Sequence, residues 1–157
     1  MPTTRNDLPD NTRKAAIALL NARLADAIDL RLAIKQAHWN VKGANFIALH
    51  ELFDQIQGRV DVFVDDIAER AVTLAGIAEG TAQAAVKGSN LPAYPLNLTE
   101  EKAVLQAVAD RLAAFGKLAR EAIDAADEAG DKDTADLFTG VSRQIDKDLW
   151  FVEAHLQ

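Results

Sequence analysis

Five side chains that can bind a metal ion lie at regular intervals within thirty-two residues of the chain. The steps between them are 12, 4, 11 and 4 residues, and the five are His38, His50, Asp54, Asp65 and Glu69. Imidazole nitrogens and carboxylate oxygens bind Fe(II) while leaving open positions, and carboxylates favour the Fe(III) that oxidation leaves. Two irons held together could give both electrons to peroxide without releasing hydroxyl radical. The residue types therefore suit an iron site.

The last four of these side chains must share one helix, which the sequence predicts from about Phe46 to Leu74. At ~100° per residue they project at about 0°, 40°, 60° and 100° around its axis and form one narrow stripe. The apolar stripe of this helix centres about 160° away. It consists of Leu49, Leu52, Phe53, Ile56, Val60, Phe63, Ile67 and Leu74. The ligand stripe should therefore face away from the core of its own bundle.

The ligand side of this helix also carries small and apolar residues, namely Ile47, Gly58, Ala68 and Val72. Such residues are unusual on a freely solvated face, so we expect another subunit to cover it. The two pairs of candidate ligands on the helix are centred about 22 Å apart, which one metal centre cannot span. If two copies of the helix lie antiparallel about a two-fold axis near Gly58 and Arg59, each pair faces the opposite pair of the partner. That arrangement gives two identical sites per dimer, each built from both chains.

The chain reads as four long helices and one long crossover. Asp10 or Asn11 can cap a first helix that runs to about Asn40, and the ligand-bearing helix follows. Turn-forming residues dominate from Gly76 to Leu98, although residues 81–87 could form a short helix.

Thr99 is the expected cap of the third helix, which ends at Gly130. The fourth helix should begin near Asp133 or Thr134. Strand-like alternation is absent from the sequence. The prediction is an all-α, ferritin-like four-helix bundle with one long crossover.

Composition favours one domain. The chain has 157 residues, of which 49% are hydrophobic and 26% charged, enough for one sizeable core. We expect a tail over residues 1–10 and a single domain over 11–157. No apolar run approaches a membrane span and the N-terminus shows no signal-type segment, so a cytoplasmic location is the expectation. There is no cysteine, which excludes disulfides and thiolate metal sites.

Ordinary ferritin-like di-iron proteins carry Glu-x-x-His motifs on two helices, and this chain has none. Its sequence instead resembles the Dps family, the mini-ferritins of bacteria and archaea. The resemblance rests on residues 38–43 (HWNVKG), 46–51 (FIALHE), 65–70 (DDIAER), 134–136 (TAD) and 149–153 (LWFVE). It covers nearly the whole chain.

The resemblance implies a hollow shell of twelve subunits that oxidises Fe(II) with hydrogen peroxide or oxygen, stores the ferric product and protects DNA from oxidative damage. It assigns His38, His50 and Asp54 to one subunit's share of each ferroxidase centre. Asp65 and Glu69 match the share of the two-fold partner. This division agrees with the split site inferred from spacing.

The resemblance also implies that acidic residues near the start of the fourth helix line pores for iron entry, with Asp127, Asp131 and Asp136 as candidates. A ring of carboxylates there would concentrate Fe(II). Acidic residues at a helix N-terminus can equally serve only to complement the helix dipole. Trp39 and Trp150 are either radical sinks near the iron or large interface anchors.

Each candidate ligand also has a simpler interpretation, because polar pairs at i,i+4 are commonly surface pairs. Five at these intervals within a matching signature favour the metal site. Asp61 falls on the ligand stripe but outside the signature, and could hold a transient iron or serve as a hydrogen-bonded interface residue. A metal-free helical scaffold would leave the stripe unexplained.

The competing function is that of a nucleoid protein that binds and compacts DNA, with ferroxidation secondary. Many Dps proteins bind DNA through lysine-rich tails, but the cations near this N-terminus are few: Arg5, Arg13 and Lys14. The formal net charge is −7, the wrong sign for a polyanion. The sequence therefore argues against direct DNA binding at physiological salt.

Overall fold

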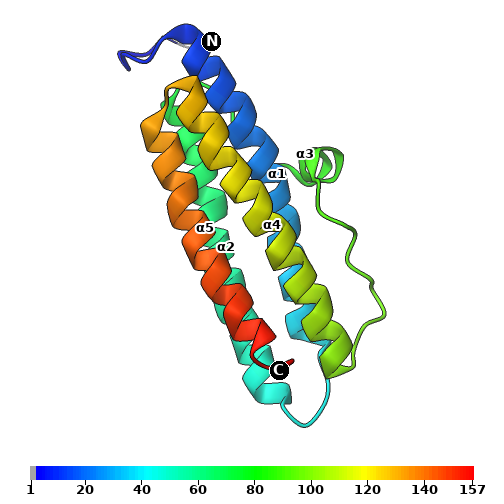
Figure 1. Cartoon of the computed structure of the whole chain (residues 1–157). Coiled ribbons are helices and arrows are strands. Elements are labelled where there is room, and N and C mark those ends of the chain that lie inside the picture. Colours follow the sequence, from blue (N-terminus) through cyan, green and yellow to red (C-terminus); the bar gives the residue numbers. More distant parts are fainter. Residues whose placement is uncertain (1–2) are drawn as a thin grey trace.

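A computed structural model describes residues 3–157, and five helices account for most of this part of the chain. They are α1 (Asp10–Asn40), α2 (Phe46–Thr73), α3 (Ala82–Gly88), α4 (Glu101–Ala129) and α5 (Lys132–Glu153). The four long helices form the bundle, while α3 lies beside α1 within the crossover that returns the chain to the start of α4 (Figure 1). The expected all-α bundle with one long crossover and a short helix inside it is confirmed.

The core lies between the long helices, each of which contributes one apolar stripe. Its largest fully buried side chains include Leu20 from α1, Phe53 from α2, Phe115 from α4 and Phe138 from α5. The predicted apolar face of α2 points inward, with only Leu52 and Phe63 partly exposed among its eight members. No helix within residues 3–157 is both long enough and apolar enough to cross a membrane.

The helix ends match the prediction more closely than the capping residues do. Gly130 ends α4 as expected, in a left-handed conformation with φ 90°. At the start of α1, however, Pro9 is the N-cap and Asp10 already belongs to the first turn, where its carboxylate pairs with Arg13. The expectation of an Asp10 or Asn11 cap was therefore wrong. Proline is well suited to this place because its ring fixes φ in the required region.

Thr99 was also assigned wrongly as a cap, whereas α5 begins at Lys132, close to the expected Asp133 or Thr134. The Glu100 carboxylate caps α4 by accepting hydrogen bonds from the amides of Lys102 and Ala103, both at 2.9 Å. The side chain of Asp131 caps α5 by accepting from the amide of Thr134 at 3.0 Å. Several adjacent residues in each segment could cap a helix. Which one does is decided by the backbone conformation of the preceding loop.

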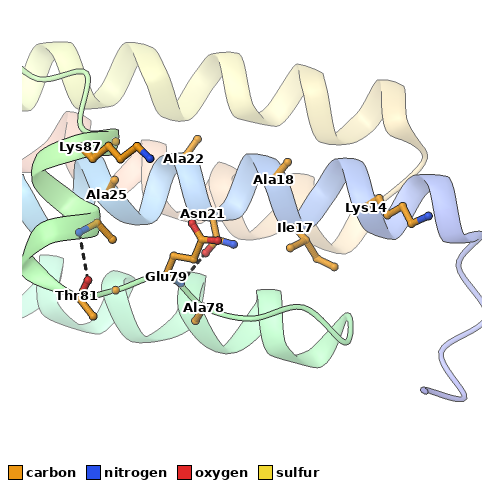
Figure 2. Close-up of a pocket in the computed structure, with 13 residues that line it drawn as sticks. Lys14, Ile17, Ala18, Asn21, Ala22, Ala25, Ala78, Glu79, Thr81 and Lys87 are labelled. Carbon is orange, nitrogen blue, oxygen red and sulfur yellow. Dashed lines mark hydrogen bonds between the residues drawn. The ribbon is translucent and has the colours of Figure 1, made fainter. Parts of the chain in front are cut away.

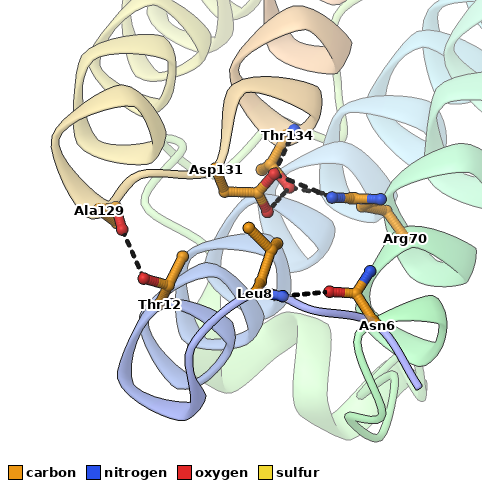
Figure 3. A network of polar contacts seen from close by, with 7 residues as sticks. All are labelled: Asn6, Leu8, Thr12, Arg70, Ala129, Asp131 and Thr134. Carbon is orange, nitrogen blue, oxygen red and sulfur yellow. Dashed lines mark hydrogen bonds and ion pairs between the residues drawn. The ribbon is translucent and has the colours of Figure 1, made fainter. Parts of the chain in front are cut away.

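The turn between α4 and α5 is fastened to both α1 and α2 (Figure 3). Arg70 of α2 donates to Asp131 at 2.9 Å and to the hydroxyl of Thr134 at 3.0 Å. That hydroxyl in turn donates to Asp131 at 2.5 Å, while Thr12 of α1 donates to the carbonyl of Ala129 at 2.8 Å. Burial acts to raise the pKa of Asp131, but the hydrogen bonds from Thr134 and the charge of Arg70 outweigh it and hold the pKa below its ordinary value.

This network predicts a pH-dependent contribution to stability. Asp131→Asn keeps a capping side chain but removes the charge, so it should lower the free energy of unfolding by about 2 kcal/mol at pH 7, as expected for charged hydrogen bonds. Because the pKa of Asp131 is depressed in the folded state, its contribution is complete above the ordinary aspartate pKa of about 4. This contribution is lost as the pH falls through the lower pKa that Asp131 has in the folded protein.

Chemical denaturation of the wild-type and Asp131→Asn proteins between pH 3 and pH 7 measures this effect. The difference between them should shrink at the acidic end. Asp133→Asn is the matched control, since Asp133 is an exposed acid in the same first turn. A difference that stays constant down to pH 3 would contradict the assignment.

Candidate metal centre

His38 and His50 form a stacked pair at the end of the bundle where α1 turns into α2. Their ring centroids are 3.7 Å apart and their planes differ by 19°. The Nδ1 atom of His38 lies 2.6 Å from the carbonyl oxygen of His50, and the Nδ1 atom of His50 lies 2.7 Å from the carbonyl oxygen of His38. Each imidazole is thus fixed by the backbone of the other ligand residue.

This reciprocal arrangement determines the tautomer of both rings. A carbonyl oxygen can only accept a hydrogen bond, so Nδ1 must carry the proton in each histidine. The lone pair of a neutral ring is then on Nε2, the atom left free to bind a metal. Fixing the second ring nitrogen through a hydrogen bond is the usual way in which proteins orient histidine ligands.

Asp54 lies one turn after His50 and completes this half of the candidate centre. Its Oδ1 atom is 4.0 Å from Nε2 of His38 and accepts a hydrogen bond from Nζ of Lys35 at 2.5 Å. That hydrogen bond, supported by the nearby histidines, holds the pKa of the exposed Asp54 carboxyl below its usual value. The carboxylate is therefore ionised, and the Lys35 ammonium is bound to the same oxygen that lies nearest His38.

Asp65 and Glu69 lie further along α2, both exposed. Within residues 3–157, no group of three or more histidine and acidic side chains is placed to hold a metal ion. His38 lies near both His50 and Asp54, but these three do not by themselves form such a group, and Asp65 and Glu69 are a separate pair on α2.

The surface between and around the two groups is apolar for an exposed helix. Ile47, Val62 and Val72 of α2 are each more than half exposed. Gly58 lies between the two groups, and a Cβ atom built on it would meet no other atom within 4 Å. Mid-helix glycine costs stability relative to alanine, so its presence is better explained by something that approaches the backbone there.

Asp61 is engaged within the chain. Its Oδ1 atom accepts from Nη1 of Arg31 in α1 at 2.6 Å, and both side chains line a groove between α1 and α2 that also contains Asp65. Of the two interpretations of Asp61, the hydrogen-bonded aspartate agrees with this contact.

The remaining sequence candidates lie apart from the centre. Trp39 and Trp150 are both about three-fifths exposed, with Trp150 tilted against Phe151. Among the pore candidates, Asp136 is exposed and Asp127 is half exposed and pairs with Lys132.

Asp131 and Arg13 do not fit their predicted roles. Asp131 is 1% exposed and bound to Arg70, so its carboxylate is occupied inside the fold. Arg13 is 9% exposed and donates to the carbonyl oxygens of Leu8 and Leu74 and to Asp10, which removes it from the candidate DNA contacts. Both corrections have the same cause, because a charged side chain at a helix end can satisfy buried backbone groups instead of facing solvent.

Arg5 and Lys14 remain exposed. Lys14 lies at one end of a groove between α1 and residues 78–88, shown in Figure 2. Asn21 fastens the wall of this groove by donating to the carbonyl of Ile77 and accepting from the amide of Glu79, both at 2.9 Å. None of the five candidate ligands lines it.

Lys35 is the residue at the centre that sequence reasoning missed. It precedes His38 by three residues and so lies on the same side of α1. The three-residue spacing indicates that Lys35 lies near His38, but a lysine in such a place is normally expected to point into solvent.

Comparisons with known proteins agree on the family of the fold. The family model described as a ferritin-like domain matches residues 17–157. A DNA protection during starvation protein from Agrobacterium fabrum is 49% identical over 154 residues, which cover 98% of this chain and 95% of that protein.

Two solved structures are similarly close in shape. DpsC from Streptomyces coelicolor superposes with a TM-score of 0.94 at 30% identity and covers 99% of this chain and 91% of its own. Mycobacterium smegmatis Dps in its tetragonal form has the same TM-score at 31% identity, with coverage of 99% and 95%.

The ion pair between Lys35 and Asp54 leads to a prediction about metal affinity. The Lys35 ammonium occupies Oδ1 of the carboxylate and repels a cation that approaches it. Lys35→Met should therefore tighten binding about fivefold, the equivalent of ~1 kcal/mol for an exposed ion pair. Anaerobic calorimetric titration with Co(II) measures the change. Lys14→Met makes the same change of charge elsewhere on α1 and should leave the affinity unaltered, and equal affinities for both variants would contradict the prediction.

Proposed function

Since this chain belongs to the Dps family of ferritin-like proteins, we propose that it oxidises Fe(II) with hydrogen peroxide or oxygen and stores the Fe(III) inside a hollow assembly of its own copies. The oxidation takes place at centres shared between two subunits. Removing free iron and peroxide together would protect DNA from oxidative damage, in keeping with the name of the Agrobacterium relative. The proposed location is the cytoplasm, where the DNA lies.

One observation carries the proposal: the candidate ligands form two incomplete groups that are separated along α2. His38, His50 and Asp54 are together, and Asp65 and Glu69 form the second group on α2. The groups are centred about 22 Å apart along the helix, too far for one centre. Two antiparallel copies of α2 bring the first group of each chain opposite the second group of the other.

Gly58 supports this arrangement because it lies close to the point about which the two groups are symmetric. It is exposed, and no side chain of its own subunit occupies the space above it. A glycine at the crossing point lets two helices approach closely, and the apolar Val62 beside it gains from being covered. With a two-fold axis at this point, Gly58 and Val62 of one subunit face the same region of the partner, so the interface is self-complementary.

The side chains act on iron in distinct ways. His38 and His50 offer Nε2 lone pairs that are already oriented, and Asp54 offers a carboxylate that is already ionised. Asp65 and Glu69 of the partner add two hard carboxylates. Two Fe(II) ions held between these groups give one electron each to peroxide, and the carboxylates stabilise the Fe(III) formed.

The shell itself is part of the proposal, with twelve subunits built from dimers. Asp127 and Asp136 are kept as candidates for the pores through which iron enters, since their exposed carboxylates can attract cations. Trp39 and Trp150 are exposed enough to anchor contacts between subunits, and either could also act as a radical sink.

The alternative function, direct binding and compaction of DNA, has little support in the electrostatics. The structure removes Arg13 from the cations available near the N-terminus and leaves Arg5 and Lys14. With a formal net charge of −7, the surface repels a polyanion at long range. Protection of DNA through iron removal needs no contact with it.

Subunit mixing tests the shared centre. His50→Ala and Asp65→Ala should each abolish rapid ferroxidation in homogeneous particles, because every site then carries one lesion. In a mixed dimer one site carries both lesions and the other carries none. Co-assembled variants should therefore regain about a quarter of the wild-type activity, since about half of randomly formed dimers are mixed and each restores one of two sites.

The measurement is the growth of ferric absorbance after anaerobic loading with Fe(II) and addition of peroxide or oxygen. Mass spectrometry must show that the particles contain both chains. Co-assembly of His50→Ala with Asp54→Ala serves as the control, since both lesions lie in the same group and mixing should restore nothing. If the mixture of His50→Ala and Asp65→Ala is no more active than either variant alone, the shared centre is excluded.

DNA binding should be weak and steeply dependent on salt. The few exposed cations near the N-terminus can contact phosphates only at low ionic strength, so a gel-shift assay should show binding lost by ~0.15 M salt. Neutralising both Arg5 and Lys14 should remove whatever binding exists at low salt. Tight binding that persists at physiological salt would favour the nucleoid function instead.

A further inference from the structure

We infer that Glu101 is a positioning residue for the histidine pair, acting from α4 by clamping the five-residue loop that joins α1 to α2. The inference rests on the proposed function, because it concerns how the metal-binding half formed by His38, His50 and Asp54 is held. Glu101 is remote in sequence from all three. No contact between its side chain and a candidate ligand is involved.

The clamp consists of three hydrogen bonds between residues 41–45 and the start of α4. The Glu101 carboxylate accepts from the backbone amide of Asn45 at 2.5 Å and from the Asn45 side-chain amide at 3.1 Å. Beside it, the amide of Lys42 donates to the carbonyl of Thr99 at 2.8 Å. Two of the three bonds therefore depend on one side chain.

Gly43 shows that the loop is shaped around this side chain. Its φ of 145° is one that L side chains rarely adopt, and a Cβ atom built there would lie 2.5 Å from Cδ of Glu101 and 2.6 Å from its Cγ. Any larger residue would have to displace the carboxylate. The Glu101 side chain thus packs directly against Gly43, in the space that a larger side chain at position 43 would need.

The clamp is well placed to control the histidines because they flank the loop. His38 is two residues before the end of α1, and His50 follows the start of α2 by four residues. Asn45, which Glu101 holds, is the N-cap of α2 and bonds through its carbonyl to the amide of Leu49 at 3.1 Å.

The reciprocal bonds between the histidines are sensitive to any movement of this loop. Each Nδ1 atom reaches the backbone carbonyl of the opposite helix, so sliding or rotating α2 against α1 lengthens both bonds at once. Loss of either bond frees the ring to rotate and to change tautomer. Oriented Nε2 atoms therefore require a fixed loop, and groups that orient metal ligands typically change metal affinity by about 10- to 100-fold.

The charge of Glu101 offers a competing explanation. The experiment must separate the effect of this charge from the effect of a side chain long enough to bond the loop. A carboxylate at two helix N-termini is favourable for both dipoles and would also attract a cation from a distance. Glu101→Gln removes the charge but keeps the length, and its amide can pair with Asn45. Glu101→Asp keeps the charge but is one methylene too short to hold the loop.

The test is anaerobic titration of the assembled protein with Co(II), followed by its visible absorption band as well as by calorimetry. Glu101→Ala and Glu101→Asp should bind at least tenfold more weakly than wild type and give an altered band. Glu101→Gln should stay within about threefold of wild type. Glu100→Ala is the matched control, since Glu100 caps the same helix and its side chain has no bond to the loop.

The outcomes separate this inference from the proposed function. Wild-type protein whose Co(II) band is absent, or is unaffected by His50→Ala, would refute the metal centre itself. If the wild-type band depends on His50 but Glu101→Ala binds no more weakly than Glu100→Ala, the clamp alone is overturned. A loss of affinity in Glu101→Gln that is absent from Glu101→Asp would assign the effect to charge and also overturn the clamp. Unfolding measured by circular dichroism shows whether the variants keep their helices.

Discussion

The arrangement of the candidate centre depends on the burial of one face of α2. Six residues of its apolar stripe are essentially inaccessible, and burying a large apolar side chain is worth about 2 kcal/mol. Turning the helix to bring Asp54 or Asp65 inward would lose that free energy and would also bury unpaired carboxylates at a cost of several kcal/mol each. The packing of the bundle thus fixes the metal-binding side chains on the outside, where only another molecule can complete their coordination.

Polar contacts then set the rotation and height of α2 against α5. Arg59 donates to Asp148 at 2.6 and 3.0 Å, and Arg70 donates to Asp131 at 2.9 Å. Burial raises the pKa of Asp148, and the bonds from Arg59 only partly offset it, whereas the bonds around Asp131 prevail over its burial. Such a buried pair gains little over apolar residues of the same size, but removing one partner is costly because it leaves a charge alone. Their value here lies in holding the helix that carries four candidate ligands.

At the histidine end, contacts within the chain hold the candidate ligands in place. The two rings are fixed by backbone carbonyls. Asp54 is ionised, and the Lys35 ammonium balances its negative charge. Prearranged ligands reduce the reorganisation that binding requires. Lys35 has the opposite effect, because its charge repels an approaching cation.

The sequence by itself determined the helices, the inward face of α2 and the spacing of the candidate ligands, because each follows from local periodicity and composition. It failed at the caps of α1 and α4, and it could not show that Asp131 and Arg13 are buried. These features depend on loop conformation and on partners distant in the chain, such as Arg70 and Leu74. Likewise, only the tertiary structure brought Glu101 to the loop before α2 and each histidine ring to the backbone of the other. A local pattern cannot specify contacts between segments that folding alone brings together.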